Sequence, residues 1–281
     1  MKKIAWIGTG VMGKPMALHL CNADYSVAVY NRTFEKAKAL EPKAVAHQNI
    51  KDCIKNADLI MSIVGYPSDV KEVYSEIFKY AKKNAILVDL TTSSPTLAKD
   101  LYEEAKKHHL SMLDAPVTGG DLGAINQTLS IMVGGDEEVF QQVLPIFQVL
   151  GKTITYMGKA GSGQHAKLAN QIAIAGTILG VAEAISYAKA QGLNLASMLD
   201  VIDGGSASSW QAKVNGRKML IKDYKPGFFI KHFMKDLKLA AEEQHVNHPI
   251  LEKTISIYQK LIDQGLEDQG TQAIIEYYFN Q

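Results

Sequence analysis

Short apolar segments alternate with segments of helical periodicity through the first half of the chain. The apolar segments are rich in β-branched residues, which is typical of buried β-strands. Strands are predicted at residues 3–7, 26–30, 59–64, 85–90, 111–115 and 128–133, and helices at residues 12–21, 35–40, 70–80 and 95–108. Strands and helices that alternate at this spacing predict βαβ units, and therefore an α/β domain with a doubly wound parallel sheet.

After about Gly163 the pattern becomes helical only. Residues 164–191 form one long stretch that is apolar nearly all round, which is typical of a helix buried on most sides. Further helices are predicted at residues 195–202, 209–221, 231–245, 249–264 and 271–279. We therefore expect residues 1–162 to form the α/β domain and residues 163–281 to form an all-helical domain, joined by the long helix. A chain of 281 residues suits two domains.

Charge and cysteine content narrow the function classes. Lys and Arg total 30 and Asp and Glu total 29, a balance that argues against partners such as nucleic acid or an anionic membrane surface. Only Cys21 and Cys53 are present, too few for a disulfide framework, so we expect a reducing, cytoplasmic location. The apolar run at the start ends at a glycine turn, unlike a signal peptide. The longest apolar stretch, residues 172–181, is shorter than the ~20 residues that span a bilayer.

A G-x-G-x-x-G pattern follows the first predicted strand and opens the first predicted helix. In that context the first glycine permits a tight turn, the second lets the backbone approach a pyrophosphate, and the third lets helix and strand pack closely. The phosphates would then meet free amides at the helix N-terminus. A glycine-rich turn without a ligand is the alternative. This pattern predicts a Rossmann-type cofactor site at Gly8, Thr9, Gly10, Val11, Met12 and Gly13.

The second predicted strand ends in Asn31, Arg32 and Thr33. A site that prefers NAD usually has an acidic residue here to bind the ribose 2′-hydroxyl, whereas a guanidinium and a hydroxyl suit a 2′-phosphate. We therefore expect NADP(H) to be preferred over NAD(H). A solvent-exposed turn arginine is the alternative interpretation of Arg32.

Two further polar motifs are candidates for substrate binding and catalysis. Thr118, Gly119 and Gly120 follow a predicted strand, where one hydroxyl and accessible backbone amides could bind an anion; a simple turn is the alternative. In the long helix, Lys167 lies three and four residues before two amide side chains, so all three share one face. The alternative is a lysine whose charge reaches solvent. The two amides are Asn170 and Gln171.

Four motifs in this order resemble the β-hydroxyacid dehydrogenase family, relatives of 6-phosphogluconate dehydrogenase. The family includes 3-hydroxyisobutyrate dehydrogenase, tartronate semialdehyde reductase and the glyoxylate/succinic semialdehyde reductases. The motifs are GTGVMGKPMA from residue 8, DAPVTGG from residue 114, GSGQHAKLANQ from residue 161 and KDL from residue 235. The similarity extends over essentially the whole chain.

The resemblance implies a role for several residues. The family's catalytic lysine falls on Lys167, and its substrate-loop serine falls on Thr118, where the extra methyl narrows the pocket. Many members have asparagine where this chain has Gln171. The resemblance also implies that Val64, Gly65 and Thr92 line the nicotinamide and that Lys235 reaches the cofactor or substrate. A homodimer or homotetramer formed through the helical domain is implied in the same way.

The expected activity is hydride transfer between NADP(H) and a small β- or γ-hydroxycarboxylate or its semialdehyde, in a cleft between the domains. Lys167 would exchange a proton with the reacting oxygen. An imine reductase is one alternative, although those enzymes usually lack a lysine here. A non-catalytic nucleotide-sensing module is another, since fold alone does not imply function.

Two remaining features say less about the function. Trp210 lies in a Gly- and Ser-rich segment and could either cap a small pocket or anchor the core. The histidine pairs His108 with His109 and His245 with His248 have no acidic third ligand, so no metal site is expected.

Overall fold

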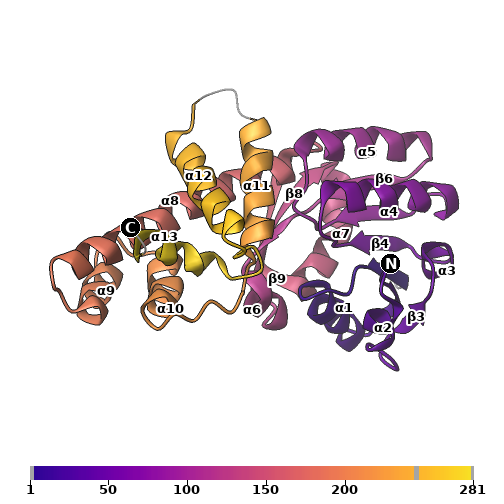
Figure 1. Cartoon of the computed structure of the whole chain (residues 1–281). Coiled ribbons are helices and arrows are strands. Elements are labelled where there is room, and N and C mark those ends of the chain that lie inside the picture. The colour runs from indigo at the N-terminus through magenta and orange to yellow at the C-terminus, as the bar shows by residue number, and fades with distance from the viewer. Residues whose placement is uncertain (1–2, 244–246, 280–281) are drawn as a thin grey trace. The chain divides into compact units, whose positions relative to one another are not determined.

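The computed structural model describes residues 3–243 and 247–279 of the chain (Figure 1). It divides into two compact units, Met1–Lys167 and Leu168–Gln281. The long helix α8 (Ser162–Ala190) begins in the first unit and continues through the second. The C-terminal end predicted for one helix, at His245, lies outside the described residues.

The first unit is built on one mixed β-sheet. Its strands are β1 (Lys3–Ile7), β2 (Ser26–Tyr30), β3 (Val45–His47), β4 (Leu59–Ser62), β5 (Ile86–Asp89), β6 (Ser111–Asp114), β7 (Val117–Thr118), β8 (Leu129–Gly135) and β9 (Gly151–Gly158). The order β3-β2-β1-β4-β5-β6 is parallel and is that of the Rossmann fold, as expected. The expected doubly wound parallel sheet is confirmed, and β8 extends it at one side, where it pairs antiparallel with β6 and β7 and parallel with β9.

Helices connect these strands in the alternation that the sequence predicts. They are α1 (Gly13–Asn22), α2 (Phe34–Lys38), α3 (Ile50–Ile54), α4 (Pro67–Tyr80), α5 (Pro95–Lys107), α6 (Gly120–Ile125) and α7 (Glu137–Leu150). The predicted strands and helices of this unit are confirmed with small shifts at their ends. The sequence analysis missed β3, α3, β7, α6, α7 and β9. Several of these elements are short, and α7 contains Pro145, which obscures its periodicity.

Both faces of the sheet are covered by apolar packing. Ile4 and Trp6 of β1 pack into one hydrophobic cluster, which includes residues of α1 and α7. Ala5 and Ile7 pack into a second cluster, which includes residues of α3, α4 and α5. Successive strand residues point to opposite faces, so a strand buried on both sides is continuously apolar. In Figure 1, α4 and α5 run next to each other, as their direct contacts require.

The second unit is helical throughout its described part, apart from one isolated bridge between Phe229 and Gly270. After α8 it contains α9 (Leu195–Gly204), the π-helix η1 (Gln211–Gly216), α10 (Arg217–Leu220), α11 (Ile230–Glu242), α12 (Pro249–Asp263), the 3₁₀ helix η2 (Thr271–Ile274) and α13 (Ile275–Phe279). The predicted helix at 209–221 is therefore a π-helix followed by an α-helix. Helices α11 and α12 lie side by side (Figure 1).

Helix α8 supplies the centre of the second unit's core. Ala175, Ala182 and Ile185 are fully buried there. Over its 29 residues, α8 is long and apolar enough to cross a membrane by length and composition, although the stretch 172–181 alone is not. A core helix satisfies the same criterion, but only 44% of that apolar window is buried, so the expectation that this helix is buried on most sides is wrong.

The close approach of α1 to β1 predicts a sharp difference between two glycine substitutions. A Cβ atom on Gly13 would lie 1.9 Å from the backbone oxygen of Gly8, whereas a Cβ on Gly10 would have no atom within 4 Å. We expect Gly13→Ala to lower the free energy of unfolding by ~1–3 kcal/mol or more. Gly10→Ala should change it by less than ~0.5 kcal/mol. Denaturant unfolding of both variants tests this, and equal stability of the two would contradict it.

Candidate active site

The conformation of the turn between β1 and α1 depends on its glycines. Gly8 has φ +95° and donates its N–H to the Tyr30 oxygen at 2.9 Å, and a Cβ there would lie 2.0 Å from the Ile63 oxygen. Only glycine fits both the left-handed backbone and that approach. The space beside Gly10 is free. The backbone can therefore be approached closely by a ligand at the second glycine of the pattern.

Thr9 and Asn31 join this turn to the end of β2. The Thr9 N–H donates to Asn31 Oδ1 at 3.0 Å, and Asn31 Nδ2 donates to the Thr33 oxygen at 3.1 Å. The Thr9 hydroxyl is buried and has no hydrogen-bond partner among the described residues. An unpaired buried hydroxyl fits a site for a polar ligand, such as the phosphates or ribose of a dinucleotide. The residues present thus fit the cofactor that the G-x-G-x-x-G pattern predicts.

Arg32 extends from the same edge into solvent. Its side chain is 81% exposed, and Nη1 lies 3.2 Å from Asp69 Oδ1. Asp69 also accepts the Tyr66 N–H at 3.1 Å, at the start of α4. One of the five guanidinium donors therefore contacts Asp69, and the exposed group can also receive a phosphate.

Polar residues end three neighbouring strands in register. Ser62, Asp89 and Asp114 are the last residues of β4, β5 and β6, and Asp89 is aligned with both neighbours. Ser62 Oγ and the Thr91 N–H both donate to Asp89 Oδ1, at 3.0 and 3.1 Å. Burial raises the pKa of Asp89 to about 6, while these hydrogen bonds oppose the shift. Val64 N–H donates to Thr91 Oγ1 at 3.0 Å, so the loops after β4 and β5 are linked.

Asp114 caps the first turn of α8. Its Oδ1 accepts the Gly161 N–H at 2.7 Å and its Oδ2 accepts the Gln164 N–H at 2.9 Å. Burial raises the pKa of Asp114 to about 6, and the backbone amides that it accepts oppose the rise. Asp114 lies in the DAPVTGG motif, but its capping role follows only from the fold.

The side chain of Gln164 ties α8 to the loop after β5. Its Oε1 accepts the Ser93 N–H at 2.9 Å, and its Nε2 donates to the Thr91 oxygen at 2.7 Å. Gln164 is fully buried, and the half-exposed Thr92 lies between its two partners. Lys167 follows three residues later and is buried. Sequence reasoning missed Gln164, which lies within the quoted motif.

The predicted substrate loop has an unusual backbone. Thr118 is half-buried at the end of β7, where it pairs with Ser130 of β8. Gly119 and Gly120 both have positive φ, at +129° and +66°. Residues other than glycine rarely adopt these conformations, so the backbone of this loop requires both glycines.

In the second unit, the amide residues of α8 connect to α11. Asn170 Nδ2 donates to Gln171 Oε1 at 2.9 Å, and Gln171 Nε2 donates to Asp236 Oδ2 at 2.7 Å. Lys235 Nζ lies 3.1 Å from Asp236 Oδ1. Gln171 and Asp236 are buried. Gln171 therefore anchors a buried carboxylate, a contact that its assignment to substrate did not anticipate.

The sequence also singled out Trp210 and the histidine pairs. Trp210 is 59% exposed, so its interpretation as a core anchor is wrong, and its role as a pocket cap stays a prediction. Among residues 3–243 and 247–279, three or more potential metal ligands do not gather anywhere. His245 is outside these ranges.

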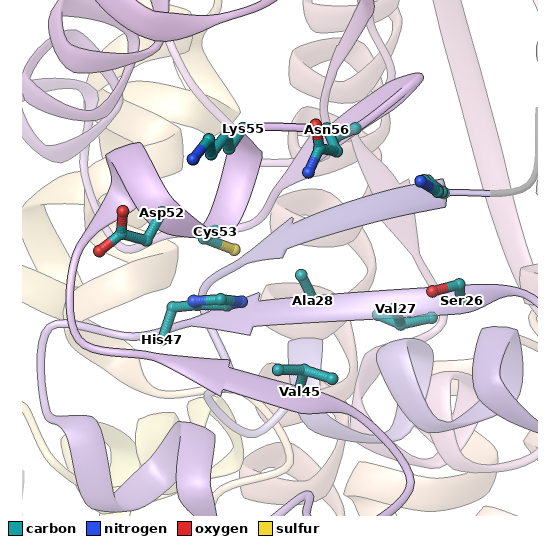
Figure 2. A pocket seen from close by; sticks show the side chains of 11 residues that line it. Ser26, Val27, Ala28, Val45, His47, Asp52, Cys53, Lys55 and Asn56 are labelled. Carbon is teal, nitrogen blue, oxygen red and sulfur yellow. The ribbon is translucent and has the colours of Figure 1, made fainter.

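A cavity of about 470 Å³ lies elsewhere, between the first three strands and α3 (Figure 2). Figure 2 shows that Ser26, His47, Asp52 and Cys53 line it. The predicted cofactor and substrate residues do not line it. Burial raises the pKa of the Cys53 thiol to about 12, which makes it an unreactive thiol at neutral pH. This cavity does not coincide with the candidate site.

Comparison with known sequences identifies related proteins over the whole chain. Residues 3–158 match the NAD binding domain of 6-phosphogluconate dehydrogenase, and residues 161–278 match a domain described as NAD-binding of NADP-dependent 3-hydroxyisobutyrate dehydrogenase. The chain is 48% identical to the uncharacterized oxidoreductase YkwC of Bacillus subtilis, covering 99% of both chains. It is 41% identical to a probable 3-hydroxyisobutyrate dehydrogenase-like mitochondrial protein of Arabidopsis thaliana, covering 97% of this chain and 84% of that one. It is 37% identical to the 2-hydroxy-3-oxopropionate reductase of Escherichia coli, covering 85% and 83%.

Related solved structures also match nearly the whole chain. A 3-hydroxyisobutyrate dehydrogenase of Mycobacterium tuberculosis, solved with L-serine, is 30% identical with a TM-score of 0.91 and covers 98% of both chains. Psf3, solved in complex with NADP+ and 2-OPP, is 26% identical with a TM-score of 0.90, over 97% of this chain and 99% of that one.

Proposed function

Because the chain belongs to the β-hydroxyacid dehydrogenase family, it is an NAD(P)-dependent oxidoreductase of hydroxyacids, and we propose a more specific activity. We propose that it transfers hydride between NADP(H) and a small β- or γ-hydroxycarboxylate or the corresponding semialdehyde. The main support for the proposal is that the first unit contains both an open glycine-rich turn at Gly10 and the buried Lys167.

Lys167 is proposed as the proton donor and acceptor. During reduction its ammonium gives a proton to the carbonyl oxygen, and during oxidation its neutral amine takes the hydroxyl proton. The bound cofactor supplies or accepts the hydride. Its place in the motif GSGQHAKLANQ supports this role. A lysine at this position also argues against an imine reductase and against a non-catalytic sensing module.

The loop of Thr118, Gly119 and Gly120 is proposed to bind the substrate carboxylate. The Thr118 hydroxyl and the two successive glycines, which place no side chain over the backbone, support the proposal. Asn170 and Lys235 are proposed to complete the polar surroundings of the substrate or cofactor. Substrates of the tartronate semialdehyde and 3-hydroxyisobutyrate type agree with the activities named for the E. coli and M. tuberculosis relatives.

Preference for NADP(H) is proposed from the end of β2. Asn31 brings no negative charge against a 2′-phosphate, and its side chain is already bonded to Thr9 and Thr33. Arg32 presents an exposed guanidinium at the same edge. NADP+ in the related Psf3 structure supports this choice of cofactor.

A substrate panel tests the proposed function. Succinic, methylmalonic and tartronic semialdehydes and glyoxylate, each with NADPH and with NADH, would be compared with butanal, a neutral aldehyde of the same length as succinic semialdehyde. We expect kcat/KM for the best carboxylate to exceed that of butanal by ~10- to 100-fold or more, because charged hydrogen bonds contribute ~1.5–3 kcal/mol. Equal use of butanal would overturn the assignment of the Thr118 loop.

Arg32→Ala should remove most of the preference for NADPH. Loss of one charged contact to the 2′-phosphate should weaken NADPH binding by ~10- to 100-fold and leave NADH use nearly unchanged. Fluorescence titration with both cofactors measures this effect. Asp69→Asn is the control, since it releases Arg32 from its ion pair while keeping an oxygen for the Tyr66 N–H, and NADPH binding should not weaken. An unmodified enzyme that favours NADH would contradict the proposal.

Lys167→Ala should lower kcat by ~100- to 10,000-fold, the contribution of a positioned acid or base. NADPH affinity should change little, because the proposed phosphate site is the β1–α1 turn. Lys167→Arg should not restore oxidation, since a guanidinium stays protonated. Lys189→Ala, at the exposed far end of α8, is the matched control and should retain normal kcat. Near-normal turnover in Lys167→Ala, with an unchanged circular dichroism spectrum, would refute the role of Lys167.

A further inference from the structure

Gln164 occupies a position that the proposed chemistry alone does not explain. Resting on the proposed function, we propose that Gln164, with Asp114, is a positioning residue that fixes the start of α8 to the loop after β5 and thereby sets where Lys167 stands. Neither side chain needs to touch the substrate for this. The proposal concerns the geometry of proton transfer, not the identity of the proton donor.

Hydrogen bonds hold Gln164 from three sides. The side-chain oxygen accepts the Ser93 N–H, the side-chain nitrogen donates to the Thr91 oxygen, and the backbone N–H donates to Asp114 Oδ2, all between 2.7 and 2.9 Å. Gln164 is fully buried, and Asp114 and Ser93 are nearly so. Water therefore cannot replace these bonds without opening the packing around them.

The bonded loop is itself rigidly held. Thr91 donates its N–H to Asp89 and accepts the Val64 N–H on its hydroxyl. The segments after β4 and β5, where Val64 and Thr92 are proposed to meet the nicotinamide, therefore belong to the same network as the first turn of α8. The side chain of Gln164 connects this network to α8.

The backbone at the start of α8 lies in close contact with two strands, which restricts its movement. A Cβ atom on Gly163 would lie 2.4 Å from the Met132 oxygen and 2.6 Å from the Asp114 oxygen, so the helix rests directly on β8 and β6. Lys167 lies three residues beyond Gln164, and side chains at this spacing share one face of a helix. A shift or rotation of the first turn would therefore be passed on to Lys167.

Loss of the Gln164 amide should lower the catalytic rate, because catalysis requires precise placement of Lys167. Removing the Gln164 amide leaves a buried N–H and a buried carbonyl without partners, each costing ~1–3 kcal/mol. The loop and helix should relax apart to recover other partners. A misplacement of ~1 Å can cost on the order of 100-fold in rate.

Gln164→Met tests the proposal with Gln272→Met as its matched control. Methionine has nearly the same length as glutamine but makes no comparable hydrogen bonds. Gln272 is also buried, and its Nε2 donates to the backbone oxygens of Asp223 and Lys225 at 2.8 and 3.0 Å. The two variants should lose similar thermal stability. Only Gln164→Met should lower kcat, by ~10- to 100-fold, with little change in KM for the semialdehyde or in NADPH affinity.

Amide hydrogen exchange supplies a readout that does not depend on activity. In Gln164→Met, exchange at Ser93 should accelerate in the folded protein, whereas Gln272→Met should leave it unchanged. Unchanged exchange at Ser93, or a kcat equal to that of Gln272→Met, would overturn the positioning role. If the unmodified protein reduced none of the aldehydes, the proposed function would fail, and exchange at Ser93 would still decide whether Gln164 joins loop and helix.

Discussion

The burial of Asp114 at the end of β6 is the constraint on which the arrangement of the first unit's candidate site depends. A carboxylate taken out of water is costly unless its oxygens are satisfied, and the backbone N–H groups of Gly161 and Gln164 satisfy them. Burial still raises the pKa of this carboxyl to about 6, so desolvation outweighs the amides. The same contacts satisfy N–H groups that would be orphaned at the start of α8, and this fixes where the helix begins.

Glycine at a few positions allows the close packing that this constraint requires. Gly163 lets α8 rest on the strand backbones, and Gly13 lets α1 rest on the turn after β1. Gly10, by contrast, has free space beside it, and there the missing side chain leaves room for a ligand rather than for the protein. Glycine therefore permits close packing at Gly13 and Gly163 and leaves room for a ligand at Gly10. Only the surrounding atoms distinguish these two roles.

Amide side chains connect separate elements within each unit. Asn31 links the glycine-rich turn to the end of β2, Gln164 links α8 to the loop after β5, and Gln171 links α8 to Asp236. An amide can donate and accept at once without adding charge, so it can join two backbone segments, or a backbone and a carboxylate, in the interior.

The sequence by itself determined the alternation of strands and helices, the Rossmann-type fold class and the family, because local periodicity and short motifs carry that information. It also located Lys167 and the Gly8–Gly13 turn as candidates. The antiparallel pairing of β8, the exposure of Trp210 and the partners of Gln164, Gln171 and Asp114 were decided only by tertiary structure. These contacts join residues up to 73 positions apart in the sequence, and which buried polar group meets which partner depends on packing that no local pattern encodes.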